Sequence, residues 1–348
     1  MKTIRTALLG ALLAAATALP TAATAQVRLA EVSGTAMDAS GGVLPGVTVT
    51  ANHVDTGQVR TTVTQAGGVF SFSALPLGRY EFRAELQGFN IALYRDVRLA
   101  IGEALRLDIR MTVAALEETV TVVGENPLVD VTKSDLGGRV DQVQVQELPL
   151  SGRNWMNLAT LAPGVKSTAT EGQPTAGLGG TNMSKVFVDG ASVQNRSTVA
   201  VDLQISQEVI GEFEVLTNRF DASLGRAGTA FVNAATKSGT DNYSGSVFLY
   251  LRDDSLSARD FFTGTREPYQ NRQVGGTFGG PLVRGRTHFF ANYERQVEPK
   301  TLSANTGIAG LDAPVDGTDN RNIYFARMDH SLSTNHRVNV RFNRSDRL

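Results

Sequence analysis

Few residues of this chain have a type and spacing that could do chemistry together. The chain contains no cysteine, which excludes disulfides, thiolate nucleophiles and cysteine zinc sites. A zinc peptidase needs closely spaced histidine and glutamate ligands, and no histidine here has a glutamate three residues away. Because phosphate-binding loops, nucleophile elbows and paired carboxylates are also missing, we expect no catalytic site, no metal and no cofactor. The histidines are His53, His288, His330 and His336.

Composition limits the class of protein further. The 33 basic and 34 acidic side chains nearly balance, so nothing predicts a surface for nucleic acid. The 35 glycines and the frequent β-branched residues favour strands and turns over helices. We therefore predict a mainly β chain, and its length of 348 residues suggests two or three domains.

The N-terminus has the pattern of an export signal. Lys2 and Arg5 precede the apolar residues 7 to 19, and a small-residue cleavage site follows. The apolar run is too short for a membrane span, which needs about 20 residues. We expect residues 1 to 25 to be a signal peptide that is cleaved before Gln26. No other segment could form a transmembrane helix, so residence in a membrane would require a β-barrel.

Residues 28 to 113 are predicted to form a small β-sandwich. Short strand-like runs alternate here with glycine and proline turns, which is typical of such folds. The last two runs are Val97–Ile101 and Leu105–Met111. The expected core comprises Phe70, Phe72, Leu75, Tyr80 and Phe82.

Two stretches of this domain, VSGTAMDASGGVLPGVTVTA and GGVFSFSALPLGRYEFRAELQGF, resemble the carboxypeptidase regulatory-like domain, a transthyretin-like sandwich. The resemblance is specific, because turn residues and aromatic residues coincide in both stretches. In metallocarboxypeptidases this module accompanies a zinc peptidase. The histidine pattern described above gives no support to that activity in this chain.

Residues 127 to 240 are predicted to form a compact α+β unit. Helices are expected over Asn154–Leu161 and Val201–Ile210, and strands over Lys185–Val188 and Glu212–Leu216. Four segments resemble, in the same order, the plug domain of TonB-dependent outer-membrane receptors. The resemblance is strongest to the Oar-like branch, which carries a carboxypeptidase regulatory-like domain before the plug. The segments are LPLSGRNWMNLATLAPGV, KVFVDGASV, IGEFEVLTNRFDASLGRAG and ATKSGTDNYSGSVF.

Two motifs of the plug lie at turns. Asp189 and Gly190 end a strand and are predicted to form a tight turn, where glycine tolerates a positive φ. Arg153 follows another turn and would pair with an acid of the plug or of the inner barrel wall. A solvated turn arginine explains the sequence equally well, and the sequence leaves both interpretations open.

Residues 241 to 348 contain five segments in which apolar and polar residues alternate. This pattern is typical of a transmembrane barrel wall, and also of a half-buried antiparallel sheet. The stretch GGPLVRGRTHFFANYE resembles an early barrel hairpin of the Oar-like receptors, which favours the barrel. The segments are Tyr243–Arg252, Asn271–Gly280, Arg286–Arg295, Asn322–His330 and His336–Arg344.

The expected architecture is thus a β-sandwich, an α+β plug and the first strands of an incomplete transmembrane antiparallel β-barrel. The resemblance implies about 22 barrel strands, more than residues 241 to 348 can supply. We interpret the chain as an N-terminal fragment of a longer receptor, or as a truncated gene product.

The linker segment EETVTVVGEN, residues 117 to 126, lies where this family carries its TonB box. The resemblance implies that a TonB-like energy-transducing protein binds it by β-augmentation, adding it as an extra strand. The alternative is that residues 119 to 123 form the last strand of the sandwich. The residues expected to bind the partner are Glu118, Thr119, Val120, Thr121, Val122 and Val123.

The function implied by the resemblance is uptake of a scarce nutrient through an outer-membrane receptor driven by TonB. The expected partners are the TonB-like protein, outer-membrane lipid and a small-molecule or oligomeric nutrient whose identity the sequence leaves open. The alternative is a secreted or surface-attached binding or adhesion protein that uses the sandwich. The region after residue 240 discriminates the two, since lipid-facing strands favour the receptor.

Overall fold

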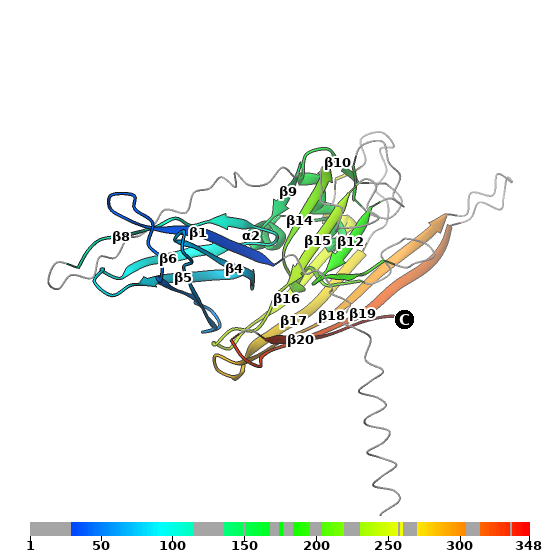
Figure 1. Ribbon diagram of the computed structural model, residues 1–348. Helices are drawn as coiled ribbons and strands as arrows, with labels where there is room; N and C mark the ends of the chain where they lie inside the picture. The colour runs from blue at the N-terminus through cyan, green and yellow to red at the C-terminus, as the bar shows by residue number, and fades with distance from the viewer. Residues whose placement is uncertain are drawn as a thin grey trace, which may run out of the picture.

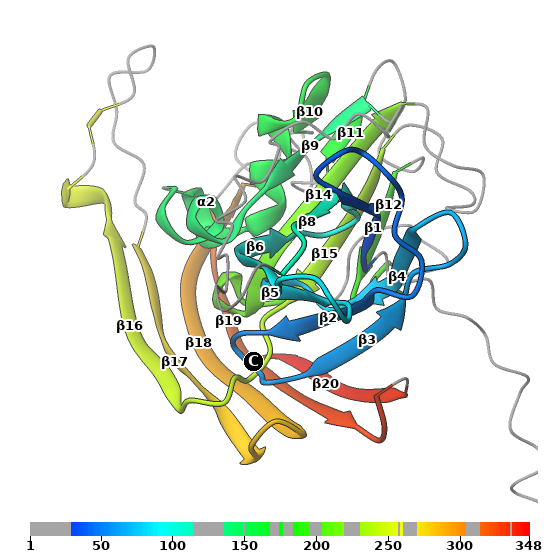
Figure 2. The ribbon, with the colours of Figure 1, turned by 60° about the vertical axis from the view of Figure 1, so that its left-hand side comes forward.

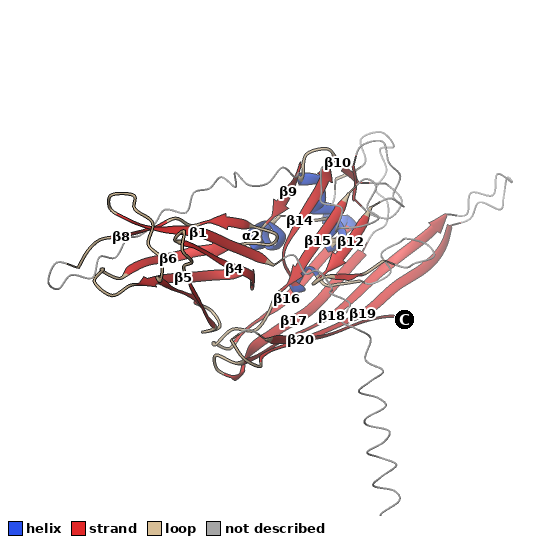
Figure 3. Cartoon of the chain, in the orientation of Figure 1, coloured by secondary structure: helices blue, strands red, loops and turns tan. Residues whose placement is uncertain are grey.

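The computed structural model of the chain consists mainly of β-strands (Figure 3). Among the described residues, no helix is long and apolar enough to cross a membrane. The expected signal peptide and the segment 117 to 126 lie outside the described residues. The structure describes residues 29–114, 136–148, 150–167, 174–176, 184–194, 204–218, 230–256, 258–259, 270–303, 314–334 and 336–348.

The first domain is the predicted β-sandwich, in which two sheets enclose a common core (Figure 1). Its strands are β1 (Ala30–Asp38), β2 (Thr48–His53), β3 (Val59–Val63), β4 (Val69–Leu75), β5 (Gly78–Glu85), β6 (Ala92–Leu99), β7 (Ala104–Arg106) and β8 (Ile109–Met111). In one sheet β1 pairs with β4, β7 and β8, and the other has the order β3-β2-β5-β6. The expected core residues, from Phe70 to Phe82, are all buried, which confirms which strand faces point inward.

The predicted bounds of two strands in the sandwich are wrong. The strand predicted over Val97–Ile101 ends earlier, because Gly102 adopts a φ of +62° within a turn that leads into β7. The run predicted over Leu105–Met111 is divided between β7 and β8. The Asp108 carboxylate lies between these two strands and accepts the backbone N–H of Thr35 at 3.0 Å. A side chain that bonds the neighbouring backbone in this way competes with regular strand pairing.

The second domain is the predicted plug region, which we call the plug, and its five-stranded sheet has the order β13-β12-β15-β14-β9. Trp155 packs edge-on against Phe213 with the ring centroids 5.2 Å apart, so a helical turn covers the sheet. The strands are β9 (Leu136–Val140), β10 (Val165–Ser167), β11 (Pro174–Ala176), β12 (Lys185–Val188), β13 (Ala191–Ser192), β14 (Ile210–Asn218) and β15 (Phe231–Thr236). The helical segments are α2 (Gln142–Glu147), η1 (Ser151–Arg153), η2 (Trp155–Leu161) and η4 (Gln207–Val209), the last three with 3-10 geometry.

The helix predicted over Val201–Ile210 is wrong for the residues of this range that the structure describes. A short 3-10 turn, η4, is followed directly by β14, which begins at Ile210. Val209 and Ile210 are both fully buried in the plug core. Packing of these two β-branched side chains against the plug sheet outweighs the local helical pattern. The helix predicted over Asn154–Leu161 is present as η2, and the Asn154 side chain caps it.

The third region is an antiparallel sheet of five consecutive strands that curves beside the plug (Figure 2); we call it the barrel wall. Its strands are β16 (Ser244–Asp253), β17 (Gln270–Val283), β18 (Thr287–Ser303), β19 (Pro314–Ser331) and β20 (Arg337–Arg347). Alternate apolar residues such as Val247, Leu249 and Val340 are exposed on one face. Polar residues such as Asn292 and Glu294 are buried on the other face. The predicted alternation is confirmed for these residues, whereas the apolar residues Phe290, Ile323 and Phe325 are also buried on the inner face. The plug covers this inner face, because Phe290 and Phe325 join its core.

The two ends of the barrel wall differ. Residues 284–286 join β17 to β18 and residues 332–336 join β19 to β20, whereas longer connections run from β16 to β17 and from β18 to β19. The sandwich lies at the end with the short turns, where the backbone N–H of Asp241 donates to the Asp55 carbonyl at 2.8 Å. Outer-membrane barrels have short turns on the periplasmic side. In a barrel of this kind the sandwich would therefore lie at the periplasmic end.

Candidate functional site

The expected coupling segment, Glu118 to Val123, falls between two described parts of the chain. On its N-terminal side the chain is described up to Ala114, whose N–H donates to the Gly88 carbonyl at 3.0 Å. On its C-terminal side the chain enters β9, the edge strand of the plug sheet. The segment therefore connects the sandwich to β9, one of the two edge strands of the described plug sheet. Whether it is a partner-binding strand or the last strand of the sandwich stays a prediction.

Asp189 and Gly190 form the tight turn between β12 and β13. Both residues have positive φ, 46° and 78°, and the flanking pair is Val188 opposite Ala191. This is the geometry of a two-residue hairpin turn, for which Asp-Gly is a favoured pair. The Asp189 carboxylate also accepts the backbone N–H of Thr236 at 2.9 Å and its hydroxyl at 2.7 Å. The turn is thereby fixed to the end of β15.

The same carboxylate reaches the barrel wall. Arg341 Nη1 lies 3.0 Å from Asp189 Oδ2, and Arg327 Nη1 lies 3.4 Å from Asp189 Oδ1. Arg327 also donates to the Thr236 carbonyl at 2.9 Å, and Arg341 donates to the Val188 carbonyl at 2.7 Å. Two arginines from neighbouring wall strands thus hold one turn of the plug.

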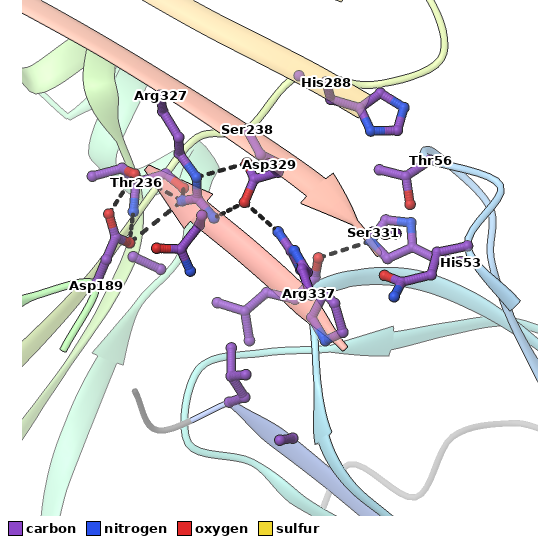
Figure 4. A pocket seen from close by; sticks show the side chains of 18 of the residues that line it. His53, Thr56, Asp189, Thr236, Ser238, His288, Arg327, Asp329, Ser331 and Arg337 are labelled. Carbon is purple, nitrogen blue, oxygen red and sulfur yellow. Dashed lines mark hydrogen bonds and ion pairs between the residues drawn. The ribbon is translucent and has the colours of Figure 1, made fainter. Parts of the chain in front are cut away.

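A second carboxylate completes this cluster. Asp329 is bonded by Arg327 at 2.8 and 3.0 Å and by Arg337 at 2.6 Å (Figure 4). The side chains of Asp189, Arg327 and Asp329 are 14%, 12% and 6% exposed. Buried charges of this kind are costly unless they are paired, so loss of one partner destabilises the arrangement. We call Asp189, Arg327, Asp329, Arg337 and Arg341 the clamp.

Arg153 is not a solvated turn arginine. Its guanidinium lies 2.8 Å from the Glu208 carboxylate of the plug, and both side chains are largely buried. The same group lies over the ring of Tyr250 at 3.7 Å and near that of Phe248 at 5.2 Å, both on β16. Arg153 therefore pairs with an acid of the plug and stacks on aromatic residues of the barrel wall. Burial lowers the pKa of the neighbouring Lys237, whose charge Glu208 supports.

The clamp arginines and Asp329 were not singled out as site residues by the sequence. Arg337 and Arg341 stand on the polar face of their segment, but their partners lie far away in the chain. One signal in the sequence could have indicated these residues. Arg327 and Asp329 are two residues apart, and Arg337 and Arg341 are four apart, so each pair lies on one face of its strand.

A cavity of about 400 Å³ lies where the sandwich, plug and barrel wall meet. It is lined by residues of all three regions, among them His53, Thr236 and Arg337. His53 Nε2 lies 3.0 Å from the Leu77 carbonyl, and Nδ1 lies 3.2 Å from the Asp55 nitrogen. Burial lowers the pKa of His53, so its neutral form is favoured. Among the described residues, no group of three or more His, Asp or Glu side chains is placed to hold a metal.

Comparisons with known proteins agree with this architecture. Residues 31–112 match the family model of the carboxypeptidase regulatory-like domain, and residues 235–311 match that of an outer membrane beta barrel domain. The TonB-dependent transporter Oar of Myxococcus xanthus is 26% identical over 279 residues, which cover 74% of this chain. The chain is related to the TonB-dependent transporters. The chain spans 26% of the length of that relative. The matches to the transporter and to the barrel domain place the chain in the outer membrane.

Two solved receptor structures are also similar, at lower sequence identity. The siderophore receptor PirA from Acinetobacter baumannii is 20% identical with a TM-score of 0.47, covering 60% of this chain and 31% of that one. A ferric enterobactin receptor mutant from Pseudomonas aeruginosa, in complex with enterobactin, is 14% identical with a TM-score of 0.48. In that case the match covers 62% of this chain and 33% of the receptor.

Proposed function

We propose that the chain acts in TonB-coupled uptake of a nutrient across the outer membrane. The observation that carries this proposal is a barrel wall with an exposed apolar face, whose buried polar face holds a plug. A wall with this polarity suits lipid on one side and a plugged lumen on the other. Outer-membrane lipid and a TonB-like protein are the partners that such a receptor would need.

The plug sheet provides a path for a pull applied to the linker. The clamp fixes the β12–β13 turn to the barrel wall, whereas β9 lies at the opposite edge and pairs with β14 alone in the described sheet. Two of the five residues of β9 are glycines, Gly137 and Gly138, which have no side chain to pack and weaken a strand. A force on the linker would therefore detach β9 first, while the clamped side stays in place.

The linker sequence suits a partner that binds by adding a strand. Thr119 to Val123 favour an extended backbone, and Glu118 limits unwanted strand pairing before the partner arrives. In β-augmentation the main-chain hydrogen bonds give most of the affinity. Side-chain truncation should therefore matter less than loss of a backbone donor.

A pair of substitutions at one position tests the proposal. Val120→Pro removes an N–H and should abolish binding to the periplasmic domain of a TonB-like protein, whereas Val120→Ala should bind almost normally. In a receptor with its whole barrel, Val120→Pro should stop uptake and leave nutrient binding at the cell surface unchanged. Equal binding by both variants, together with unfolding of the sandwich by Val120→Pro, would show that residues 119 to 123 belong to the sandwich.

A further inference from the structure

The turn Ala100–Glu103 of the sandwich lies against the plug sheet. The backbone N–H of Ile101 donates to the Glu212 carboxylate of β14 at 2.5 Å. Ile101 is 1% exposed, yet it does not belong to the sandwich core, and it lines the cavity together with Ala234 and Ala235 of β15. The plug therefore contributes to the burial of this side chain.

The same turn reaches two further plug side chains, Arg139 and Glu214. Glu103 accepts the Ala100 N–H at 2.8 Å, which shapes the turn, and its carboxylate lies 3.7 Å from Arg139 Nη1 of β9. Gly102 faces Glu214 so closely that an added Cβ would lie 2.5 Å from its carboxylate oxygen. The turn thus contacts β14 and also β9, the edge strand that follows the linker.

The charges at this contact are arranged around Glu212. Burial raises the pKa of its carboxyl, while the Ile101 N–H, Arg139 and Arg98 favour the charged form and Glu103 opposes it. Two of these supporting groups, Ile101 and Arg98, come from the sandwich, and Arg98 Nη2 lies 3.9 Å from the carboxylate. Glu212 is 7% exposed, and its carboxylate accepts a hydrogen bond from the sandwich. Because a buried charge without such partners is costly, this contact indicates an interface between the two domains.

A second contact lies beside the barrel wall. The backbone N–H of Asp241 donates to the Asp55 carbonyl at 2.8 Å, and the Asp241 carboxylate accepts the Gly285 N–H at 2.7 Å and faces His288 Nε2 at 2.8 Å. The sandwich is therefore held at two points, one on the plug and one at the start of the wall.

We propose that the turn Ala100–Glu103 is a docking element that fastens the sandwich to the plug sheet and braces β9 against detachment. This inference rests on the proposed function for its purpose, because β9 is the strand on which a pull through the linker would act. Release of the docking turn then precedes detachment of β9, so the sandwich sets the force at which the plug opens.

Docking can be measured directly in the whole chain. Because the chain has no cysteine, Val63→Cys and Leu161→Cys allow two nitroxide labels, one on the sandwich and one on the plug, at side chains 54% and 53% exposed. Electron–electron distance measurements on the purified chain in detergent should give one narrow distribution. A broad distribution in this parent protein would overturn the proposal.

Two glycine substitutions provide a matched test of the turn itself. Gly102 and Gly88 both have positive φ, so alanine strains either backbone in the same way. At Gly88 an added Cβ would meet nothing within 4 Å, whereas at Gly102 it meets Glu214. Gly102→Ala should therefore lose the narrow distance distribution, and Gly88→Ala should retain it. Glu212→Ala should act like Gly102→Ala from the plug side, and retention of the narrow peak in both would contradict docking through this turn.

The bracing of β9 has its own readout. Hydrogen exchange of the Gly138 and Arg139 amides should become faster in Gly102→Ala and Glu212→Ala and stay unchanged in Gly88→Ala. Unchanged exchange in all three variants would refute the brace while leaving the proposed function intact. Conversely, failure of a TonB-like protein to bind residues 117 to 126 would refute the proposed function without altering the label distances or the exchange rates.

Discussion

Replacement of Asp189 by asparagine tests whether the clamp holds the plug in the barrel wall. The amide oxygen can still accept the Thr236 N–H. The negative charge facing two guanidinium groups is lost, and an NH2 group replaces the oxygen that accepts from Arg341 and from the Thr236 hydroxyl. In the variant, Arg327 retains its two hydrogen bonds to the Asp329 carboxylate, at 2.8 and 3.0 Å. Arg341 retains only a neutral partner among these groups, the Val188 carbonyl at 2.7 Å. A buried pair that loses one partner costs about 3–5 kcal/mol, and the support from Asp329 puts our expectation near the lower value, about 3 kcal/mol.

The single tryptophan of the chain makes this loss measurable in the plug alone. Trp155 is buried against Phe213, so its fluorescence reports unfolding of the plug core. With a urea slope of about 1–3 kcal/mol per molar, Asp189→Asn should lower the midpoint by about 1–3 M. Asp96→Asn is the matched control, because Asp96 also has a positive φ, 58°, but is exposed on the sandwich. Equal midpoints for the two variants would refute the account of the clamp.

Three further predictions concern the sandwich and the plug. Phe72→Ala should destabilise the sandwich by about 3–5 kcal/mol, seen as lost amide protection in β1 and β4, while Val69→Ala on the exposed face of the same strand should change little. Arg153→Ala should lower the Trp155 midpoint by an amount equivalent to about 3 kcal/mol, because Glu208 loses its closest partner, while exposed Arg106→Ala should cost less than about 1 kcal/mol. Burial lowers the pKa of His53 in the folded chain below the value of 6.5 that it has in the unfolded chain. Between the folded and unfolded pKa, the unfolded chain therefore binds more protons than the folded chain. The stability of the sandwich should therefore fall as the pH drops below about 6.5, which amide protection of β2 and β5 measures. The same pH dependence in the parent protein and in His53→Gln would contradict this.

Patterns that repeat along a strand were predicted well from the sequence. The period-two spacing of Val247, Leu249 and Leu251 predicted the outer face of β16, and the structure exposes these three side chains. The sandwich core from Phe70 to Phe82 was predictable for the same reason, since period-two alternation depends on the local backbone alone. The turn at Asp189 and Gly190 was likewise local, because its conformation follows from the two residues themselves.

Features that depend on distant partners were not predictable. The Asp189–Arg327 contact joins residues 138 positions apart, and the spacing along either strand does not say which plug atom the arginine meets. The helix predicted over Val201–Ile210 failed because burial of Val209 and Ile210 in the plug core decided the local structure. Arg153 remained ambiguous for the same reason, since Glu208 and Tyr250 reach it only through the fold.

The barrel wall is expected to have lipid on its outer face and the plug on its inner face. A fluorophore attached at Val247→Cys tests this most directly, because Val247 is 90% exposed on the outer face and the chain has no competing cysteine. In outer membranes, lipid-dissolved quenchers should quench this label and aqueous quenchers should not, whereas a label at Val63→Cys on the sandwich should behave in the opposite way. Quenching at Val247→Cys by the aqueous reagent alone would contradict the account and favour a soluble binding protein.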